Sequence, residues 1–147
     1  MNIGVGINSN LSMDKINLVT MLFDDIQQEL KVKNYGSSLK SVSIGFICVS
    51  EQFDFFFKSK KAKWSKGKKV VSPDGIPFIF EDDLEIPMKI DFITFQNGTE
   101  KQCFKLLANG ILNSLDEVDF MKKKPIDFNL DKFKRDIKDF LMHKNYF

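Results

Sequence analysis

The sequence is poor in the side chains that carry most acid–base and metal chemistry. It has one histidine, His143, which falls near the end of a charged segment expected to be helical. Histidine is the commonest metal ligand and the most frequent general acid or base. No cysteine or carboxylate pair stands at ligand spacing from His143, and the chain lacks the G-x-S-x-G pattern of a nucleophilic serine. These absences argue against an enzyme and a metal site, and we expect no cofactor.

Cysteines and long apolar stretches are also scarce. Cys48 and Cys103 each lie within a segment of periodic apolar residues, which favours two buried free thiols over a disulfide or a metal pair. No stretch approaches the roughly 20 apolar residues of a membrane-spanning helix, and the first residues lack the basic and apolar regions of a signal peptide. We therefore expect a cytoplasmic protein that does not bind membranes.

Aromatic residues are abundant but unevenly distributed among the three types. The chain has 16 Phe against 2 Tyr and 1 Trp. Phe adds bulk without a hydroxyl or an indole N–H, so most of these rings are expected in the core. With 147 residues, of which 43% are hydrophobic, the chain has the usual size and composition of one domain. We expect residues 1–147 to form a single α+β domain.

Apolar periodicity predicts the order of helices and strands. Thr99 and Gln102 have the spacing of a capping box at the start of one helix, whereas Gly110 in its interior weakens that helix by about 1 kcal/mol relative to Ala. Pro77 and Pro87 cannot donate to a strand ladder and indicate sheet edges or bulges. The expected elements are strands at 1–7, 39–49, 53–57, 70–71, 76–80 and 84–92, and helices at 12–33, 99–115 and 130–141.

This order predicts an α+β fold in which an antiparallel β-meander sheet packs against about three α-helices. The 39–49 segment is apolar on both faces, which is typical of a central strand. Gly4 and Gly6 precede the first helix as in a dinucleotide-binding fingerprint, but Ser9 replaces the third glycine. Because repeated βαβ units are also absent from the pattern, we interpret these glycines as residues that permit close packing or a bulge.

A lysine-rich segment is the first candidate for a binding surface. Residues 58–69 read KSKKAKWSKGKK, with seven lysines and no acidic residue. A solvated hairpin whose lysines prevent edge-to-edge aggregation explains this pattern, and a hairpin that binds a protein through Trp64 is a second interpretation. A third is a nucleic-acid groove, but the net charge of +2 and the single arginine, Arg135, argue against it. The candidate partner-binding residues here are Lys60, Lys61, Lys63, Trp64 and Lys66.

An acidic segment follows the lysines directly. Residues 74–91 contain six acidic residues and one lysine, Lys89. Two blocks of opposite charge so close in sequence can face each other across a hairpin. The acidic residues are typical of a solvated turn, which could also meet a basic partner. The candidate partner-binding residues in this segment are Glu81, Asp82, Asp83 and Glu85.

The second half of the chain contains short motifs that occur together in one known family. They are Ile90-Asp91-Phe92-Ile93-Thr94-Phe95, the helix with Leu106-Leu107 and Ile111, Lys122-Lys123-Lys124, Asp127-Phe128, and Leu130-Asp131-Lys132-Phe133-Lys134-Arg135-Asp136-Ile137. Together with Tyr35-Gly36 and the 39–49 strand, they resemble the immunity protein 44 family of bacterial polymorphic-toxin systems over roughly residues 35–141. The resemblance implies a cytoplasmic protein that binds a cognate toxin domain tightly and blocks it. It transfers no catalytic motif and no toxin-contact signature.

Three functional hypotheses follow, from three different classes. The first is an immunity protein that neutralises a cognate toxin domain by steric and electrostatic occlusion. The second is a small nucleic-acid-binding domain that uses residues 58–69, for which steep salt dependence of binding would be diagnostic. The third is an enzyme with an unrecognised site. The sequence leaves the oligomeric state open.

Overall fold

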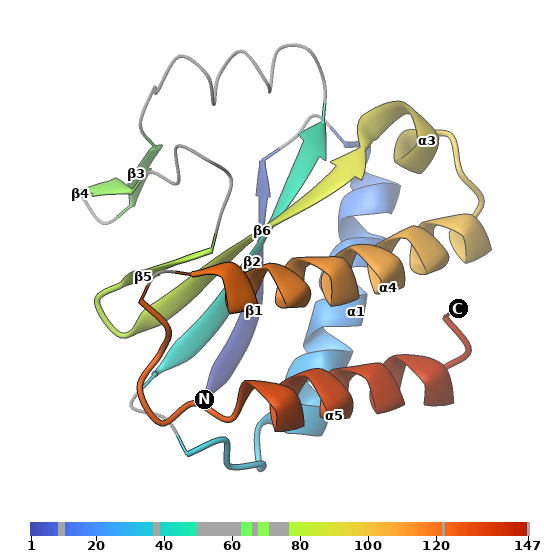
Figure 1. Ribbon diagram of the computed structural model, residues 1–147. Helices are drawn as coiled ribbons and strands as arrows, with labels where there is room; N and C mark the ends of the chain where they lie inside the picture. Colours follow the sequence, from blue (N-terminus) through green and yellow to red (C-terminus); the bar gives the residue numbers. More distant parts are fainter. Residues whose placement is uncertain are drawn as a thin grey trace.

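The computed structural model contains a four-stranded sheet with helices packed on it (Figure 1). It describes residues 1–8, 11–36, 39–49, 63–65, 68–70, 77–121 and 123–146. The sheet has the strand order β1-β2-β6-β5, and β3 and β4 form a separate two-stranded sheet. The strands are β1 (Asn2–Asn8), β2 (Ser41–Val49), β3 (Lys63–Ser65), β4 (Lys68–Val70), β5 (Phe78–Phe80) and β6 (Asp83–Asp91).

Strand direction differs from the expected meander. β1 is parallel to β2 and β2 is parallel to β6, whereas β5 is antiparallel to its neighbour β6. The connection between β1 and β2 contains the helix α1 (Met13–Leu30), and β6 follows β2 only after β3, β4 and β5. The prediction of an antiparallel meander was therefore wrong. The α+β class and the central position of the 39–49 strand are confirmed.

The polar character of one sheet face explains this error. Parallel sheets are usually covered on both faces, and their strands then read as continuous apolar runs. Here Leu84, Ile86 and Met88 on one face of β6 are buried, whereas Glu85 and Pro87 between them are not. Apolar alternation thus reports that one face is covered, and it carries no information about strand direction.

Three of the described helices begin at side-chain caps, of which one was predicted, whereas the helix α1 begins without a side-chain cap. The Thr99 side chain accepts a hydrogen bond from the Gln102 N–H, and the Gln102 side chain accepts one from the Thr99 N–H, which confirms the capping box. The Asp91 carboxylate accepts from the Thr94 N–H and starts a short helix that the sequence analysis missed. The remaining helices are α3 (Phe92–Gln96), α4 (Glu100–Asp116), the 3-10 helix η1 (Glu117–Phe120) and α5 (Leu130–His143).

The helices bury one face of the sheet. α1 packs on β1, α4 packs on β6, and α5 contacts both α1 and α4 (Figure 1). The strand register places Ile3 beside Val42 and Val42 beside Leu84, and each of these side chains is 5% exposed or less. The core cluster also contains Cys103, a buried free thiol as expected. The side chain of Cys48 lies outside the described part of the chain.

Gly110 allows α4 to lie close to the sheet. A Cβ atom at this position would lie 3.2 Å from Met88 Sδ and 3.3 Å from Ile90 Cδ1. Glycine removes that Cβ and permits the close approach. The helix is continuous through Gly110. The packing of α4 on β6 therefore offsets the low helix propensity of the glycine.

The two prolines lie near the end of the described β5–β6 ladder. Pro77 immediately precedes β5. Pro87 lies beyond Glu85, the last residue of β6 that pairs with β5, while its other side faces β2. Proline lacks the N–H that a ladder on both sides would need. β5 is an edge strand of the described sheet, which agrees with the prediction of an edge at Pro77, whereas the edge or bulge expected at Pro87 stays a prediction.

Gly4 and Gly6 lie inside β1 and not in the turn that precedes α1. Dinucleotide-binding folds place their glycines in the strand–helix turn, where backbone N–H groups face the phosphates. A Cβ atom at either position would meet no heavy atom within 4 Å, and the register with β2 is regular. The interpretation of these glycines as close-packing or bulge residues was therefore wrong.

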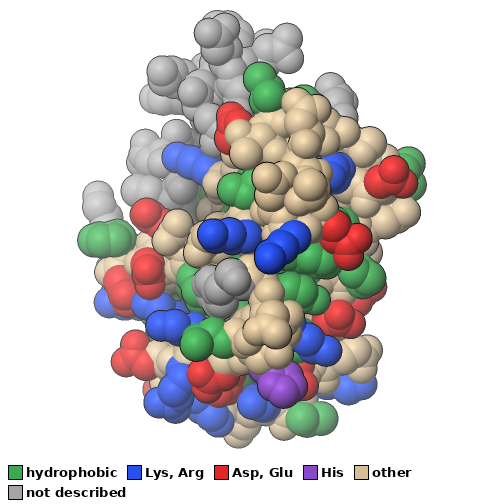
Figure 2. All heavy atoms as spheres, turned by 90° about the vertical axis from the view of Figure 1, so that its right-hand side faces the viewer, with side chains coloured by type: hydrophobic (Ala, Val, Ile, Leu, Met, Phe, Trp, Pro, Cys, Tyr) green, Lys and Arg blue, Asp and Glu red, His purple; other side chains and the backbone are tan. Residues whose placement is uncertain are grey.

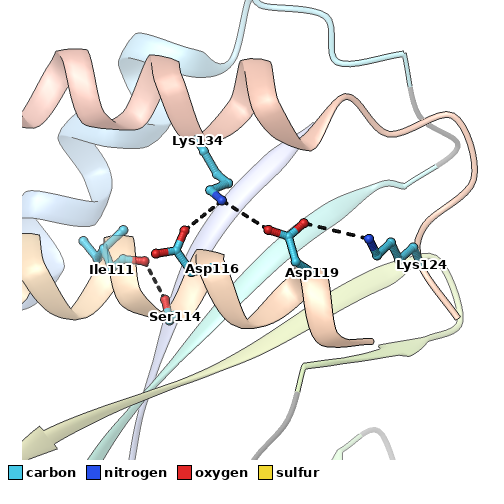
Figure 3. A network of polar contacts seen from close by, with 6 residues as sticks. All are labelled: Ile111, Ser114, Asp116, Asp119, Lys124 and Lys134. Atoms are coloured by element: carbon cyan, nitrogen blue, oxygen red, sulfur yellow. Dashed lines mark hydrogen bonds and ion pairs between the residues drawn. The ribbon is translucent and has the colours of Figure 1, made fainter. Parts of the chain in front are cut away.

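An ion-pair network joins α5 to the end of α4 (Figure 3). Lys134 Nζ lies 2.7 Å from Asp116 Oδ1 and 3.5 Å from Asp119 Oδ2. Lys124 Nζ lies 3.9 Å from the other carboxylate oxygen of Asp119. The hydrogen bond to Asp116 raises the pKa of Lys134. Because water screens exposed ion pairs, this network orients α5 more than it stabilises the fold.

Candidate partner-binding surfaces

The lysine-rich segment forms a hairpin of its own. β3 and β4 pair antiparallel, with Trp64 opposite Lys69. Lys63 and Trp64 lie in β3, and their side chains are not among those that the structure describes. The described strands of the acidic segment belong to a different hairpin, β5–β6, and do not pair with β3 or β4, so the possible hairpin between the two charged blocks is not found among the described strands. Outside the described residues lie the candidates Lys60, Lys61 and Lys66.

The acidic candidates gather in and beside the tight turn between β5 and β6. Glu81 and Asp82 connect the two strands. The Lys40 N–H donates a 2.8 Å hydrogen bond to the Asp82 carbonyl oxygen, and Lys40 Nζ lies 3.5 Å from Asp82 Oδ2. The Ser41 hydroxyl donates to the Asp83 carboxylate. The residues at the start of β2 thus hold this turn in place.

Glu81 has a backbone conformation that favours glycine. Its φ is 55°, in the left-handed region that costs a residue with a Cβ about 1 kcal/mol. Glycine would adopt the same conformation without this cost. The side chain of Glu81 is exposed. The turn therefore presents a carboxylate to solvent at a position where glycine would be more stable, which is a pattern found at binding sites.

Among the described residues, four carboxylates gather at this end of the sheet. The carboxylates of Glu81, Asp82, Asp83 and Glu85 are accompanied by the ammonium group of Lys40. The side chains of Lys40 and Asp82 are 80% and 55% exposed, so water screens their ion pair. Asp83 and Glu85 are half-buried and lie on the sheet face opposite the helices. These four carboxylates, hereafter the acidic turn, can attract a basic partner surface.

An open hollow beside α1 and α5 is a feature that the sequence analysis missed. Its volume is about 530 Å³. Figure 2 shows the single histidine of the chain among lysine and acidic side chains on this side of the molecule. No pattern in the sequence predicts this hollow, because its lining residues come from segments about a hundred positions apart. They are Glu29, Lys33, Asp136, Asp139, Phe140, His143 and Lys144.

Asp136 links this hollow to the core. Its carboxylate accepts a 2.8 Å hydrogen bond from the Tyr35 hydroxyl and lies 3.9 Å from Lys33 Nζ. Burial raises the pKa of Tyr35, and the hydrogen bond to Asp136 raises it further. Acidic and basic side chains occur in similar number around the hollow. Charge alone therefore selects neither an anion nor a cation there.

The described residues also bear on whether the chain has a metal site or a membrane-spanning helix. Within these ranges, no group of three or more His, Cys, Asp or Glu side chains is placed to hold a metal ion. Among the same residues, no helix is both long and apolar enough to cross a membrane. His143 is exposed in the last turn of α5, in the charged segment that was predicted to be helical.

Comparison with known proteins gives the class of this chain as immunity proteins. A family model described as immunity protein 44 matches residues 1–143. The chain therefore belongs to the immunity protein 44 family, as the resemblance suggested, and the match also includes β1 and α1. The family is generally non-enzymatic, which agrees with the expectation that the protein is not an enzyme. No curated protein and no solved structure matches the chain.

Proposed function

We propose that this protein binds a cognate bacterial polymorphic-toxin domain in the cytoplasm and neutralises it by occluding its active surface. The observation that carries this proposal is the family match over residues 1–143. Occlusion needs a stable surface of fixed shape. The core cluster, which extends from Ile3 in β1 to Leu141 in α5, supports residues 1–147 as one domain that provides such a surface.

We place the toxin-contact surface at the acidic turn and at the β3–β4 hairpin. The acidic turn carries four carboxylates, and the strained conformation of Glu81 supports a functional role for its side chain. Charge on such a surface raises the rate of association with an oppositely charged partner. Trp64 in β3 supplies the type of large aromatic residue that anchors many protein interfaces. The toxin surface that these elements would meet is therefore basic beside the acidic turn.

The direct test is protection of cells from the toxin domain encoded next to this protein. Cells that express the toxin domain should survive when this chain is co-expressed, and the two proteins should purify together. Death of the co-expressing cells, with both proteins folded and present, would contradict the proposed function.

Charge reversal at the acidic turn tests the contact surface. Glu81→Lys should lower the association rate with the toxin domain by about tenfold at low salt, with a smaller effect at high salt. Asp24→Lys is the matched control, because Asp24 is an exposed acidic residue of α1 and the change in formal charge is the same. Equal rates for the two variants would remove the acidic turn from the interface.

Replacement of Trp64 tests the hairpin. Trp64→Ala should raise the dissociation constant of the toxin complex by about tenfold or more if the ring is an interface anchor. Trp64→Phe is the control, because it keeps an aromatic ring and the strand propensity. Unchanged affinity of the Trp64→Ala variant for the toxin domain would exclude Trp64 as an anchor of the toxin interface.

Nucleic-acid binding is the alternative function that the lysine-rich hairpin favours. The segment has seven lysines, and Lys69 lies opposite Trp64 in the β3–β4 ladder. A nucleic-acid groove combines lysines for phosphates with an aromatic ring for base stacking. Titration of labelled single-stranded DNA and RNA at several salt concentrations separates the two functions. Strong binding with a steep salt dependence, and no toxin complex, would favour this alternative.

A further inference from the structure

The outer edge of β1 has no neighbouring strand in the part of the chain that the structure describes. β1 stands at the end of the sheet opposite β5 (Figure 1). The Asn2 N–H donates to the Lys40 carbonyl oxygen, so the even-numbered residues of β1 direct their backbone groups to β2. The backbone groups of Ile3, Val5 and Ile7 then point to the outer edge, because they alternate along a strand. Within the described ranges no strand pairs with that edge, and the Ile3 N–H is covered by the side-chain oxygen of Gln27.

The two edges of the sheet differ in how they resist pairing with another chain. β5 has only three residues, follows Pro77 and ends at the acidic turn. Shortness, proline and charge are the usual protections of an edge strand. β1 has seven residues and contains neither a proline nor a charged side chain. Its edge therefore lacks each of the protections that the β5 edge has.

The sequence of β1 is the same in both directions. It reads Asn-Ile-Gly-Val-Gly-Ile-Asn from residue 2 to residue 8. Two copies of this strand, placed antiparallel about an axis at Val5, would therefore match at every position. Ile3 would lie opposite Ile7 of the second copy, and Gly4 would lie opposite Gly6 of the second copy. Such self-complementarity is what a two-fold symmetric interface requires.

We propose that the edge of β1 binds β1 of a second copy of this chain, antiparallel about a two-fold axis at Val5, so that the two sheets become one. The outward backbone groups of Val5 would exchange two hydrogen bonds across the axis, and Ile3 and Ile7 would exchange the others. β-Branched side chains would pair on the helix-covered side. On the opposite side the glycines leave room, since a Cβ atom at Gly4 or Gly6 would meet nothing within 4 Å.

The dimer is expected to be weak and independent of toxin binding. The Gln27 side chain has to release the Ile3 N–H before all the backbone bonds can form. A single strand pair buries less than the roughly 1,200 Å² of a typical stable interface, so the dimer should form only at high protein concentration. The acidic turn lies at the opposite edge of the sheet, beside β5 and β6, and stays exposed in this dimer.

Sedimentation of the purified full chain over a concentration series measures the self-association. The chain should change from monomer to dimer as its concentration rises. Val5→Pro removes the N–H that points to the outer edge and leaves the ladder to β2 intact, so it should raise the dissociation constant of the dimer by about tenfold or more. Val5→Thr keeps the N–H and the β-branched shape, and it should form the dimer like the parent chain. Circular dichroism verifies that both variants are folded.

A cross-link tests the strand register without depending on the proline variant. Gly4 and Gly6 of the second copy would form a pair without mutual hydrogen bonds, in which Cα atoms lie about 4.5 Å apart, within disulfide range. The double variant Gly4→Cys, Gly6→Cys should give a disulfide-linked dimer on mild oxidation, whereas either single variant and the parent chain should give much less.

Two results would overturn the proposal. One is a chain that stays monomeric at every concentration, with no cross-link in the double variant. The other is a dimer that forms equally well in Val5→Pro and also gives no cross-link. Protection of the β1 amides from hydrogen exchange by the toxin domain, in a chain that is monomeric alone, would instead assign this edge to the toxin.

Discussion

The two faces of the four-stranded sheet are opposites in composition. The face covered by α1, α4 and α5 presents Ile3, Val42, Ile44 and the even-numbered residues of β6, all of them buried. The opposite face presents Gly4, Gly6, serines of β2 and charged residues of β6, none of them buried. On the helix-covered side, Gly110 of α4 lies so close to β6 that a Cβ would contact Met88 and Ile90, whereas a Cβ at Gly4 or Gly6 on the opposite face would meet nothing within 4 Å. A sheet can therefore have stability concentrated on one face while the other remains available for binding.

Truncation of a buried residue tests this comparison with the largest effect. Ile86→Ala removes a side chain that is 1% exposed and should lower the free energy of unfolding by about 2–5 kcal/mol. Lys89→Ala, at an exposed position on the opposite face of β6, should change that free energy by about 0.5 kcal/mol or less. Urea unfolding of the two variants provides both values. Similar losses would mean that the opposite face is also packed.

Replacement by valine should have opposite effects on stability at two glycines. Gly110→Val places new methyl groups against Met88 and Ile90, and it should destabilise the protein by about 1–3 kcal/mol. Gly6→Val meets open space in a strand and should stabilise it by up to about 1 kcal/mol. Thermal unfolding followed by circular dichroism compares the two. A loss of stability in Gly6→Val would show that this face is covered.

Relief of backbone strain should separate stability from binding. Glu81→Gly should raise the free energy of unfolding by about 1 kcal/mol and weaken toxin binding. Asp127→Gly is the control, because Asp127 has a φ of 57° in the connection before α5 and should gain similar stability without loss of affinity. Chemical unfolding and toxin titration are made on both variants. Equal affinity would exclude a role for the Glu81 carboxylate.

The smallest expected effect is a pH dependence of the free energy of unfolding, caused by Tyr35 on the helix-covered side. Burial raises the pKa of Tyr35 in the folded state above its unfolded value of about 10. The folded state therefore holds the proton more tightly, so this contribution to stability is complete below pH 10 and is lost as the pH rises above it. Tyr35→Phe should lose about 1 kcal/mol at neutral pH and show a shallower decline above pH 10. Urea unfolding at several alkaline pH values gives the free energy of unfolding of the parent chain and of Tyr35→Phe. If Tyr35 did not contribute, the two free energies would fall with pH at the same rate.

Local patterns predicted the elements more reliably than their pairing. The capping box at Thr99 and the sheet edge beside Pro77 depend on neighbouring residues, and both were visible in the sequence. The direction of β6 depends on its pairing with β2, whose residues lie about forty positions earlier in the chain. Alternation along β6 looks the same in a parallel and an antiparallel sheet when one face is polar.

The candidate surfaces show the same limit. The acidic turn was predicted because its carboxylates are adjacent in sequence, but the contacts with Lys40 and Ser41 that hold it were not. No local sequence pattern predicted the hollow beside α1 and α5, because Asp136 and Lys33 are far apart in the chain and come together only in the folded protein. The proposed roles of Trp64 and of the lysines around it remain predictions.

Titration calorimetry of the purified chain with the toxin domain encoded beside it is the most direct test of toxin neutralisation. An inactive variant of the toxin domain allows both proteins to be produced without harm to the host. We expect tight one-to-one binding, and loss of the toxin's activity when the active domain is mixed with an equal amount of this protein. Absence of binding to a folded toxin domain, with its activity undiminished by this protein, would contradict it.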